Sequence, residues 1–352
     1  MDTSQLHEAM LYDRLSDQRV QCRLCAQRCL IVAGQTGVCR VRQNHGGTLY
    51  TLVYGRLIAQ AVDPIEKKPL FHYLPGTSSF SIATPGCNLR CSFCQNADIS
   101  QRPSMLGCVD GRDTPAETVV EAARRHDCAS IAYTYTEPTI FFEYAYDVGR
   151  LAHEAGLANV YVTNGSMSLE MLDVAAPPEG PLLMDAANVD LKSFRDAFYR
   201  KECGGRLQPV LDNLRTLHAR GVWVEVTTLV IPGRNDSEEE LRDVARFIAR
   251  EMSVDTPWHV SRFHPTYRLT DAPPTPVATL VRAREIGIEE GLRYVYVGNV
   301  PGSDAESTFC PQCGERVIGR KGFQVTQRRL RGSTCAWCGT EIAGLLADQP
   351  AG

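Results

Sequence analysis

The chain has 352 residues, 43% of them apolar and 22% charged, a composition typical of a folded globular protein. Its net charge of −4 at pH 7 gives no overall basic surface for nucleic acid, so a nucleic-acid substrate is disfavoured. No apolar run approaches the roughly 18 residues that span a membrane. Residues 1–5 do not begin a secretory signal, so we expect a cytoplasmic protein with no membrane partner.

Fourteen cysteines are distributed unevenly along the chain. In a reducing compartment, cysteines at short spacings indicate metal ligation rather than disulfides. Eleven of them form three groups: Cys22, Cys25, Cys29 and Cys39 near the N-terminus, Cys87, Cys91 and Cys94 in the centre, and Cys310, Cys313, Cys335 and Cys338 near the C-terminus.

The N-terminal group offers four ligands, with Gly34 and Gly37 as turn residues before the last of them. A small lobe of this kind has no large apolar core, so a bound metal would supply its folding energy. We expect this Cys-rich lobe to span residues 1–75 and to bind zinc. A second iron–sulfur cluster is the alternative for the same four cysteines.

Short β-branched runs alternate with longer amphipathic segments from residue 79 onward, a pattern that predicts repeated βα units. The expected strands are residues 79–84, 130–136, 159–163, 187–191, 222–231, 259–263 and 293–297. The expected helices are residues 114–125, 139–155, 169–175, 208–219, 238–252 and 276–290. About six parallel units favour an open barrel over residues 76–303, although the pattern alone does not exclude a doubly wound sheet.

Polar and turn-forming residues follow these strands, where parallel α/β barrels have their active sites. Glu137-Pro138 follows the second strand and Asn164-Gly165 the third, while Asp190 and Lys192 stand at the end of the fourth. Each of these residues alone is an ordinary turn signal. Their coincidence at one edge of a sheet indicates a functional site.

The central cysteines follow the first strand with the spacing Cys-x3-Cys-x2-Cys, and Phe93 precedes the last of them. Three thiolates can hold three irons of a cubane cluster and leave the fourth iron open to a small molecule. A zinc knuckle or buried free thiols are the alternatives, but a zinc site usually has four ligands in two close pairs.

This loop, residues 86–96, resembles the cluster loop of the radical S-adenosylmethionine (radical SAM) enzymes. Residues 63–72, 133–138, 189–192, 258–265 and 294–299 extend the likeness. Over essentially its full length the chain resembles the radical SAM enzymes of the AmmeMemoRadiSam system, which are related to the pyruvate formate-lyase activating enzymes. The fold implied is α/β: a partial (β/α)6 TIM-like barrel with small Cys-rich metal-binding N- and C-terminal lobes.

The resemblance also implies roles for individual residues. Cys87, Cys91 and Cys94 would ligate a 4Fe-4S cluster that binds S-adenosylmethionine (SAM). The SAM contacts that it implies are Phe93 near the adenine, Thr136 and Glu137 at the methionyl amine, Asn164, Asp190 and Lys192 at the amine and carboxylate, and His264 near the ribose. The superfamily usually has glycines where this chain has Tyr135 and Thr136.

The implied reaction is reductive cleavage of SAM to methionine and a 5′-deoxyadenosyl radical, which abstracts hydrogen from a substrate. A low-potential ferredoxin or flavodoxin is the expected donor, and the resemblance implies association with the two partner protein families of the AmmeMemoRadiSam system. Glycyl-radical-enzyme activation, or another modification of a protein or small molecule, is the expected outcome. The alternatives are a scaffold protein that binds zinc and iron with a structural cluster, and a radical SAM enzyme that modifies nucleic acid.

The C-terminal group, in residues 304–352, is typical of a zinc ribbon. Each of its Cys-x2-Cys pairs is followed by a glycine, Gly314 or Gly339, which lets backbone amides turn toward the thiolates. Between the pairs lies a basic patch beside Phe323, made of Arg320, Lys321, Arg328, Arg329 and Arg331. A solvated face is the plain interpretation of this patch, and a contact with an acidic partner or nucleic acid is the alternative.

Overall fold

The computed structural model describes residues 6–300, 302 and 304–346. Residues 1–5, at which we expect no secretory signal, lie outside this part of the chain. None of the helices that the structure describes has both the length and the apolar character needed to cross a membrane.

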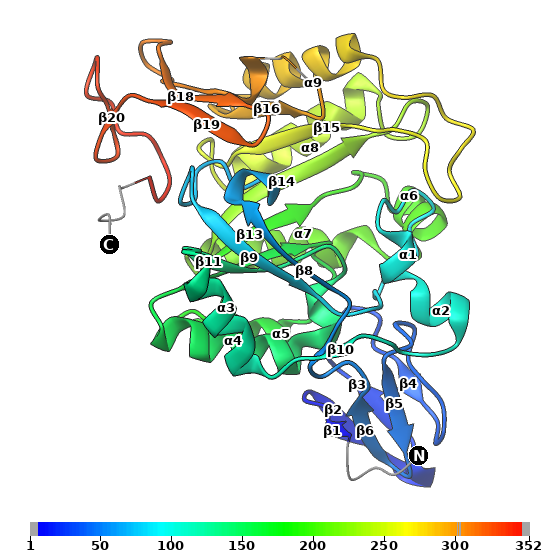
Figure 1. Cartoon of the computed structure of the whole chain (residues 1–352). Coiled ribbons are helices and arrows are strands. Elements are labelled where there is room, and N and C mark those ends of the chain that lie inside the picture. The colour runs from blue at the N-terminus through cyan, green and yellow to red at the C-terminus, as the bar shows by residue number, and fades with distance from the viewer. Residues whose placement is uncertain (1–5, 301, 303, 347–352) are drawn as a thin grey trace.

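A central sheet of eight strands carries the fold, with the N-terminal lobe on one side and the C-terminal lobe on the other (Figure 1). Seven of its strands pair in parallel in the order of the chain. They are β9 (Ser78–Ala83), β11 (Ser130–Tyr133), β12 (Ala158–Thr163), β13 (Ala186–Asp190), β14 (Trp223–Val230), β15 (Trp258–Arg262) and β16 (Val295–Gly298). The eighth, β8 (Ala59–Pro64), pairs antiparallel with β9 at one edge.

Helices connect the successive parallel strands. The main ones are α3 (Ala116–Arg125), α4 (Phe142–Glu154), α5 (Leu169–Ala175), α7 (Leu207–Ala219), α8 (Glu238–Glu251) and α9 (Val277–Glu289). Six βα units and a seventh strand therefore confirm the predicted α/β partial barrel. The expected strand 130–136 ends early, at Tyr133, because Tyr135 adopts a left-handed backbone with φ 62°.

Short elements occupy the connections at the carboxyl edge of the sheet, and all but η4, which begins the helix expected at residues 139–155, were not expected from the sequence. They are α1 (Ala97–Ser100), α2 (Arg102–Leu106) and β10 (Arg112–Asp113) after β9, η4 (Pro138–Phe141) after β11, and α6 (Asp196–Phe198) with the π-helical η5 (Tyr199–Cys203) after β13. Strand β10 pairs with β7 (Arg56–Leu57), which joins the first connection to the N-terminal part of the chain.

The N-terminal lobe contains two small antiparallel sheets. Their strands are β1 (His7–Glu8), β6 (Thr48–Thr51) and β5 (Arg42–His45) in one, and β2 (Tyr12–Arg14), β3 (Val20–Cys22) and β4 (Leu30–Ile31) in the other, with η2 (Ser16–Gln18) between β2 and β3. Strand β8 lies within the range expected for this lobe, yet it pairs with the barrel. The division into residues 1–75, 76–303 and 304–352 stays a prediction.

The C-terminal lobe is built from short antiparallel strands after η6 (Asp304–Glu306). They are β17 (Thr308–Phe309), β18 (Arg316–Lys321), β19 (Gln324–Arg328), β20 (Leu330–Arg331) and β21 (Thr334–Cys335).

One residue of the expected basic patch does not belong to a solvated face. Arg320 is 4% exposed, because its guanidinium points inward and contacts Glu66, Phe71 and Thr308.

Residues 63–72, which include η3 (Ile65–Lys67), lie where the barrel meets the C-terminal lobe. Arg320 donates to the carbonyl of Phe71 at 2.6 Å and forms a buried ion pair with Glu66 at 3.5 Å. From the barrel side, the buried Glu225 carboxylate accepts the amides of Phe71 and His72, at 3.0 and 2.7 Å. This segment is therefore clamped between two buried charged groups.

We predict that Arg320→Met lowers stability by about 3–5 kcal/mol, because Glu66 would be left buried without its counter-charge. The double variant Glu66→Gln/Arg320→Met should recover part of that loss, because it removes both charges. Thermal and urea unfolding of the metal-loaded protein measure both effects. A single variant as stable as the unaltered chain would contradict the buried pair.

Candidate active site

The carboxyl ends of the parallel strands surround a cavity of about 530 Å³. Cys87, Cys91 and Cys94 line it from the loop between β9 and α1. Parallel strands that follow one another around a barrel bring all of their carboxyl ends to the same side. The cysteine loop therefore faces the polar residues that follow the other strands.

Contacts on both flanks fix the cysteine loop. Gly86 has φ +112°, and a Cβ atom there would lie 2.9 Å from Cγ1 of Val41 in the N-terminal lobe, so only glycine fits. On the other flank, the amides of Arg90 and Ser92 donate to two carbonyls at the end of η5, at 2.7 and 2.8 Å. The loop is thus held between the N-terminal lobe and the connection after β13.

Each thiol of the loop has a polar neighbour. Leu89 donates its amide to Cys87 Sγ at 3.4 Å, and Cys94 Sγ lies 3.2 Å from the Ser100 hydroxyl. Burial raises the pKa of Cys87 and of Cys94. By contrast, a hydrogen bond from the Cys203 thiol lowers the pKa of Cys91. Cys203 belongs to η5, so this connection also sets the environment of the cysteines.

A partly buried ion pair lines the same cavity. Lys192 Nζ donates to Asp190 Oδ2 at 2.8 Å, and the same ammonium lies 5.8 Å from the centre of the Phe93 ring. Burial opposes the charge on Lys192, but Asp190 and Cys91 raise its pKa well above the usual value. Both signs of charge are therefore available in the cavity within one side-chain pair.

The carboxylate of Glu137 joins the ends of β11 and β12. It accepts the amide and hydroxyl of Thr139 at 3.1 and 2.6 Å, the Thr163 hydroxyl at 2.7 Å and the Asn164 amide at 2.8 Å. Burial raises the pKa of this carboxyl, and the surrounding donors oppose that increase. The side chain of Glu137 thus organises the cavity wall.

The residues that replace the expected glycines hold the same wall in another way. Tyr135 takes the left-handed conformation that suits glycine, and its hydroxyl donates to Asp63. Thr136 donates its hydroxyl to the carbonyl of Thr84 at 2.7 Å. Hydrogen bonds to neighbouring strands therefore hold a conformation that is costly for a non-glycine residue.

Asn164 connects the third strand end to the cysteine loop. Its Nδ2 donates to Asn88 Oδ1 at 2.8 Å and lies 3.8 Å from Cys87 Sγ, while its Oδ1 accepts the Ser166 amide at 2.9 Å. This residue holds the loop and touches a cysteine at the same time.

All of the site residues expected around the central cysteines line this cavity, with the exception of His264. His264 is exposed and lines an adjoining cavity of about 720 Å³. The two cavities share five lining residues, namely Pro69, Gln95, Ser261, Asn299 and Phe323.

Sequence reasoning missed Asn88 and Cys203. Asn88 lies inside the cysteine motif, so its position was a usable signal. Cys203 stands alone in the sequence, 109 residues after Cys94 by numbering, and nothing local marks it. Only the return of the chain through η5 brings it to Cys91.

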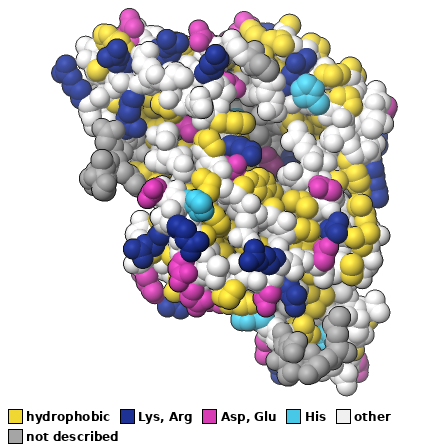
Figure 2. Space-filling model, in the orientation of Figure 1, with side chains coloured by type: hydrophobic (Ala, Val, Ile, Leu, Met, Phe, Trp, Pro, Cys, Tyr) yellow, Lys and Arg dark blue, Asp and Glu magenta, His cyan; other side chains and the backbone are white. Residues whose placement is uncertain are grey.

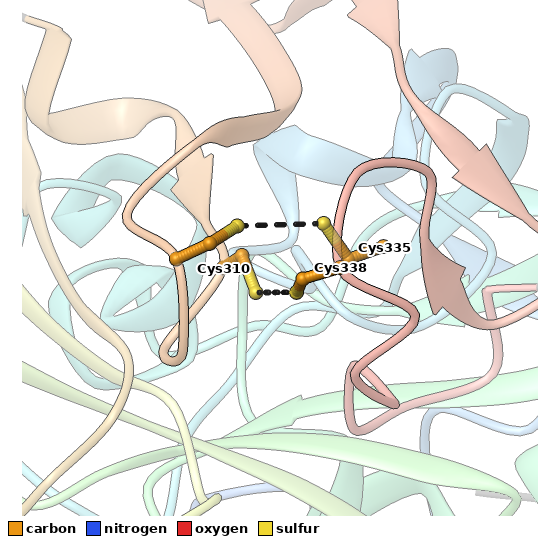
Figure 3. Close-up of side chains that lie close together, drawn as sticks. Cys310, Cys335 and Cys338 are labelled. Carbon is orange, nitrogen blue, oxygen red and sulfur yellow. Dashed lines mark hydrogen bonds between the residues drawn. The ribbon is translucent and has the colours of Figure 1, made fainter.

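The C-terminal cysteines converge from two loops (Figure 3). Cys310 Sγ lies 3.5 Å from Cys338 Sγ, and Cys313 Sγ lies 3.7 Å from Cys335 Sγ. Their four sulfur atoms lie within 4.8 Å of one another, so this group can hold a metal ion. The N-terminal cysteines line a separate cavity.

Comparison with known proteins identifies the family. The profile described as "Radical SAM superfamily" matches residues 81–248, which contain the cysteine loop and the strands from β11 to β14. The chain is also 45% identical to an uncharacterized protein of Methanocaldococcus jannaschii over 339 residues, which are 96% of this chain and 99% of that protein. The chain belongs to the radical SAM superfamily.

Two other relatives of this radical SAM protein are named as activating enzymes. The pyruvate formate-lyase-activating enzyme of Clostridium pasteurianum is 23% identical over 176 residues, 48% of this chain and 69% of that one. The isethionate sulfite-lyase activating enzyme of Oleidesulfovibrio alaskensis is 39% identical over 75 residues, 20% of this chain and 24% of that one. Superfamily membership implies an enzyme with a 4Fe-4S cluster and SAM, and radical SAM enzymes generally need a reductant.

We predict that Glu137→Gln lowers the free energy of unfolding by about 2 kcal/mol, since the amide nitrogen of glutamine would face a donor now satisfied by the carboxylate. Glu154→Gln at the exposed end of α4 is the matched control and should change little. Thermal unfolding of the two variants measures the difference. Equal midpoints would contradict the four-donor arrangement.

Proposed function

We propose that this radical SAM protein cleaves SAM reductively at a cluster held by Cys87, Cys91 and Cys94. The observation that carries the proposal is the presence of three cysteines and a charged pair on one cavity at the carboxyl edge of a parallel barrel. Its volume of about 530 Å³ lies within the roughly 300–1,000 Å³ of small-molecule sites.

The donor set fits an iron–sulfur cubane. Among the described residues, the C-terminal cysteines are the one group of potential metal ligands whose atoms all lie within 4.8 Å of one another. The sulfurs of Cys87, Cys91 and Cys94 are therefore more widely spaced than those of the C-terminal group. A cubane places an iron between each thiolate and the cluster centre, which demands such spacing. When bound together, a reduced 4Fe-4S cluster and SAM supply a 5′-deoxyadenosyl radical that abstracts hydrogen from a substrate.

The residues of the chain would then bind and orient SAM. Lys192 and Asp190 offer an ammonium for the methionyl carboxylate and a carboxylate for the amine. Phe93 would lie near the adenine, while Thr136, Glu137 and Asn164 would hold the methionyl end. His264 would meet the ribose from the adjoining cavity.

The adjoining cavity gives room for a substrate beside SAM. It is bordered by Lys321, Gly322 and Phe323 of the β18–β19 hairpin, so the C-terminal lobe forms part of its wall. Phe323 is 48% exposed and lines both cavities. This hairpin would contact the substrate, for which a protein segment or a small molecule is the proposed class.

Activation of a glycyl-radical enzyme is the proposed version of this chemistry, supported by the two relatives named as activating enzymes. We further propose that the chain is the radical SAM enzyme of the AmmeMemoRadiSam system, works with the two partner families of that system, and takes electrons from a cytoplasmic ferredoxin or flavodoxin.

On the face in Figure 2, Lys and Arg side chains alternate with Asp and Glu, which disfavours nucleic acid there.

Anaerobic reconstitution with iron and sulfide, followed by reduction in the presence of SAM, should yield 5′-deoxyadenosine. Cys94→Ala should abolish this product, because the cluster would lose one of its three ligands. Cys108→Ala is the matched control: Cys108 is exposed and outside the site, so the yield should be unchanged.

Two results would argue against the proposal. A fully loaded protein that makes no 5′-deoxyadenosine would favour a scaffold with a structural cluster. Undiminished cleavage by Cys94→Ala would refute the assignment of the ligands.

We propose zinc for the C-terminal group. A tetrahedral ion with Zn–S bonds of about 2.3 Å holds its sulfurs roughly 3.8 Å apart, and the sulfur pairs here lie at 3.5 and 3.7 Å. The cavity walls at Lys321–Phe323 belong to the same lobe, so the ion would stabilise part of the substrate site.

Cys313→Ser should remove about one zinc per chain and lower the thermal stability of the C-terminal lobe, because structural zinc contributes folding energy. The iron content should stay the same, since this group lies apart from the barrel cavity. Elemental analysis and thermal unfolding give the two values. Loss of iron instead of zinc in this variant would contradict the proposal.

A further inference from the structure

The N-terminal cysteines converge on a cavity against the barrel. Cys22, Cys25, Cys29 and Cys39 all line it, although they come from four places around β3, β4 and β5. Cys22 and Cys25 are buried, while Cys29 and Cys39 are partly exposed. The group therefore lies just beneath the surface of the lobe.

The spacing of these sulfurs differs from that in the ribbon. Among the described residues, no three of the four N-terminal sulfurs lie within 4.8 Å of one another, in contrast to the ribbon. The cavity that all four cysteines line has room for a water molecule, about 10 Å³ for its centre. Four thiolates on one zinc at about 2.3 Å leave no such room, whereas a cubane requires it.

A buried cation on the cavity wall points to an anionic occupant. Arg42 is 2% exposed and lines the cavity with the cysteines. Its terminal nitrogens bind Glu143 and the carbonyl of Met10, but its Nε has no hydrogen-bond partner among the described residues. A buried donor without a partner is costly, and a cluster with four thiolates and bridging sulfides would provide an acceptor.

Backbone amides face three of the four thiols. Val38 donates to Cys29 Sγ at 3.4 Å, and the amides of Gln27 and Val41 donate to Cys25 and Cys39. Hydrogen bonds of this kind stabilise thiolates and tune the potential of iron–sulfur clusters. Burial raises the pKa of Cys25, Cys29 and Cys39, and these amides partly oppose that increase.

This cavity shares a wall with the central cysteine loop. Asn88, the residue after Cys87, lines it, and Gln27 Nε2 donates to the Asn88 carbonyl at 2.9 Å. The Cys39 carbonyl lies 3.4 Å from the position of a Cβ on Gly86. The ligand loops of the two cysteine groups are thus in direct contact.

We propose that Cys22, Cys25, Cys29 and Cys39 ligate a second 4Fe-4S cluster, in place of the zinc that the sequence favours, and that this cluster passes electrons to the first. The relay rests on the proposed function, whereas the metal assignment does not. One electron from a low-potential one-electron donor enters the N-terminal cluster and moves on to the cluster of the central cysteines. The N-terminal cluster returns to its oxidised state, and no bond or proton changes.

Metal analysis of the reconstituted full-length protein tests the assignment. The triple variant Cys87→Ala/Cys91→Ala/Cys94→Ala leaves the N-terminal ligands unchanged and should retain about four irons. After reduction with dithionite it should give a 4Fe-4S spectrum in electron paramagnetic resonance. The unaltered chain should contain about eight irons, and Cys25→Ser about four. Cys128→Ser, a buried cysteine outside all three groups, is the control and should match the unaltered chain.

A triple variant that contains zinc but no iron would overturn the assignment, and so would Cys25→Ser that loses zinc while it keeps all of its iron. Neither readout depends on activity. Failure of the proposed function is recognised separately, since it would leave the unaltered chain with a full iron content but no 5′-deoxyadenosine under dithionite.

The relay is tested by comparing two reductants in Cys39→Ser. We measure how fast reduced flavodoxin and dithionite each reduce the remaining cluster, and take the ratio of the two rates. This ratio should fall at least tenfold relative to the unaltered chain, because only the protein donor needs the N-terminal cluster as its entry point. An unchanged ratio would refute the relay.

Discussion

Parallel pairing of seven strands in chain order is the constraint on which the site depends. Each βα unit returns the chain to the same end of the sheet, so every connection after a strand reaches the same edge. The ends of all seven parallel strands thereby supply the cavity wall, together with Lys67, Pro69 and Phe323 from outside them. No single segment holds enough chemistry to form the site alone.

Buried charges attach the two lobes to this barrel. In the N-terminal lobe, Arg42 pairs with Glu143 at 2.7 Å, and Glu143 belongs to α4 of the barrel. At the other side, Arg320 of the C-terminal lobe pairs with Glu66. Removal of one partner from such a pair leaves an uncompensated buried charge, which makes the relative placement of the parts specific. Arg42 lines the cavity of the N-terminal cysteines, and Glu66 lines the cavity of about 720 Å³ beside the active site. Each lobe therefore helps to shape one cavity.

The three cysteine groups share one local geometry. In each group an amide two residues after a cysteine donates to its sulfur, as at Cys25, Cys39, Cys87, Cys94, Cys313 and Cys338. This turn presents a thiolate to a metal whether the metal is zinc or iron. What differs is the spacing between sulfurs, which is compact in the ribbon and wider in the other two groups. The different metals that we propose for these groups therefore rest on the packing around the turns.

The sequence by itself determined the alternation of strands and helices and the central cysteine motif, because both leave local signals. Alternating apolar periods placed α5 at Leu169–Ala175 and the ends of most other helices within two residues. Contacts between distant segments left no such signal. The burial of Arg320, the approach of Cys203 to Cys91, the antiparallel β8 and the position of His264 in an adjoining cavity depend on how the chain returns in space. The same is true of the spacing of the N-terminal sulfurs, since the sequence shows which cysteines are grouped and only tertiary packing fixes the distances between their sulfurs.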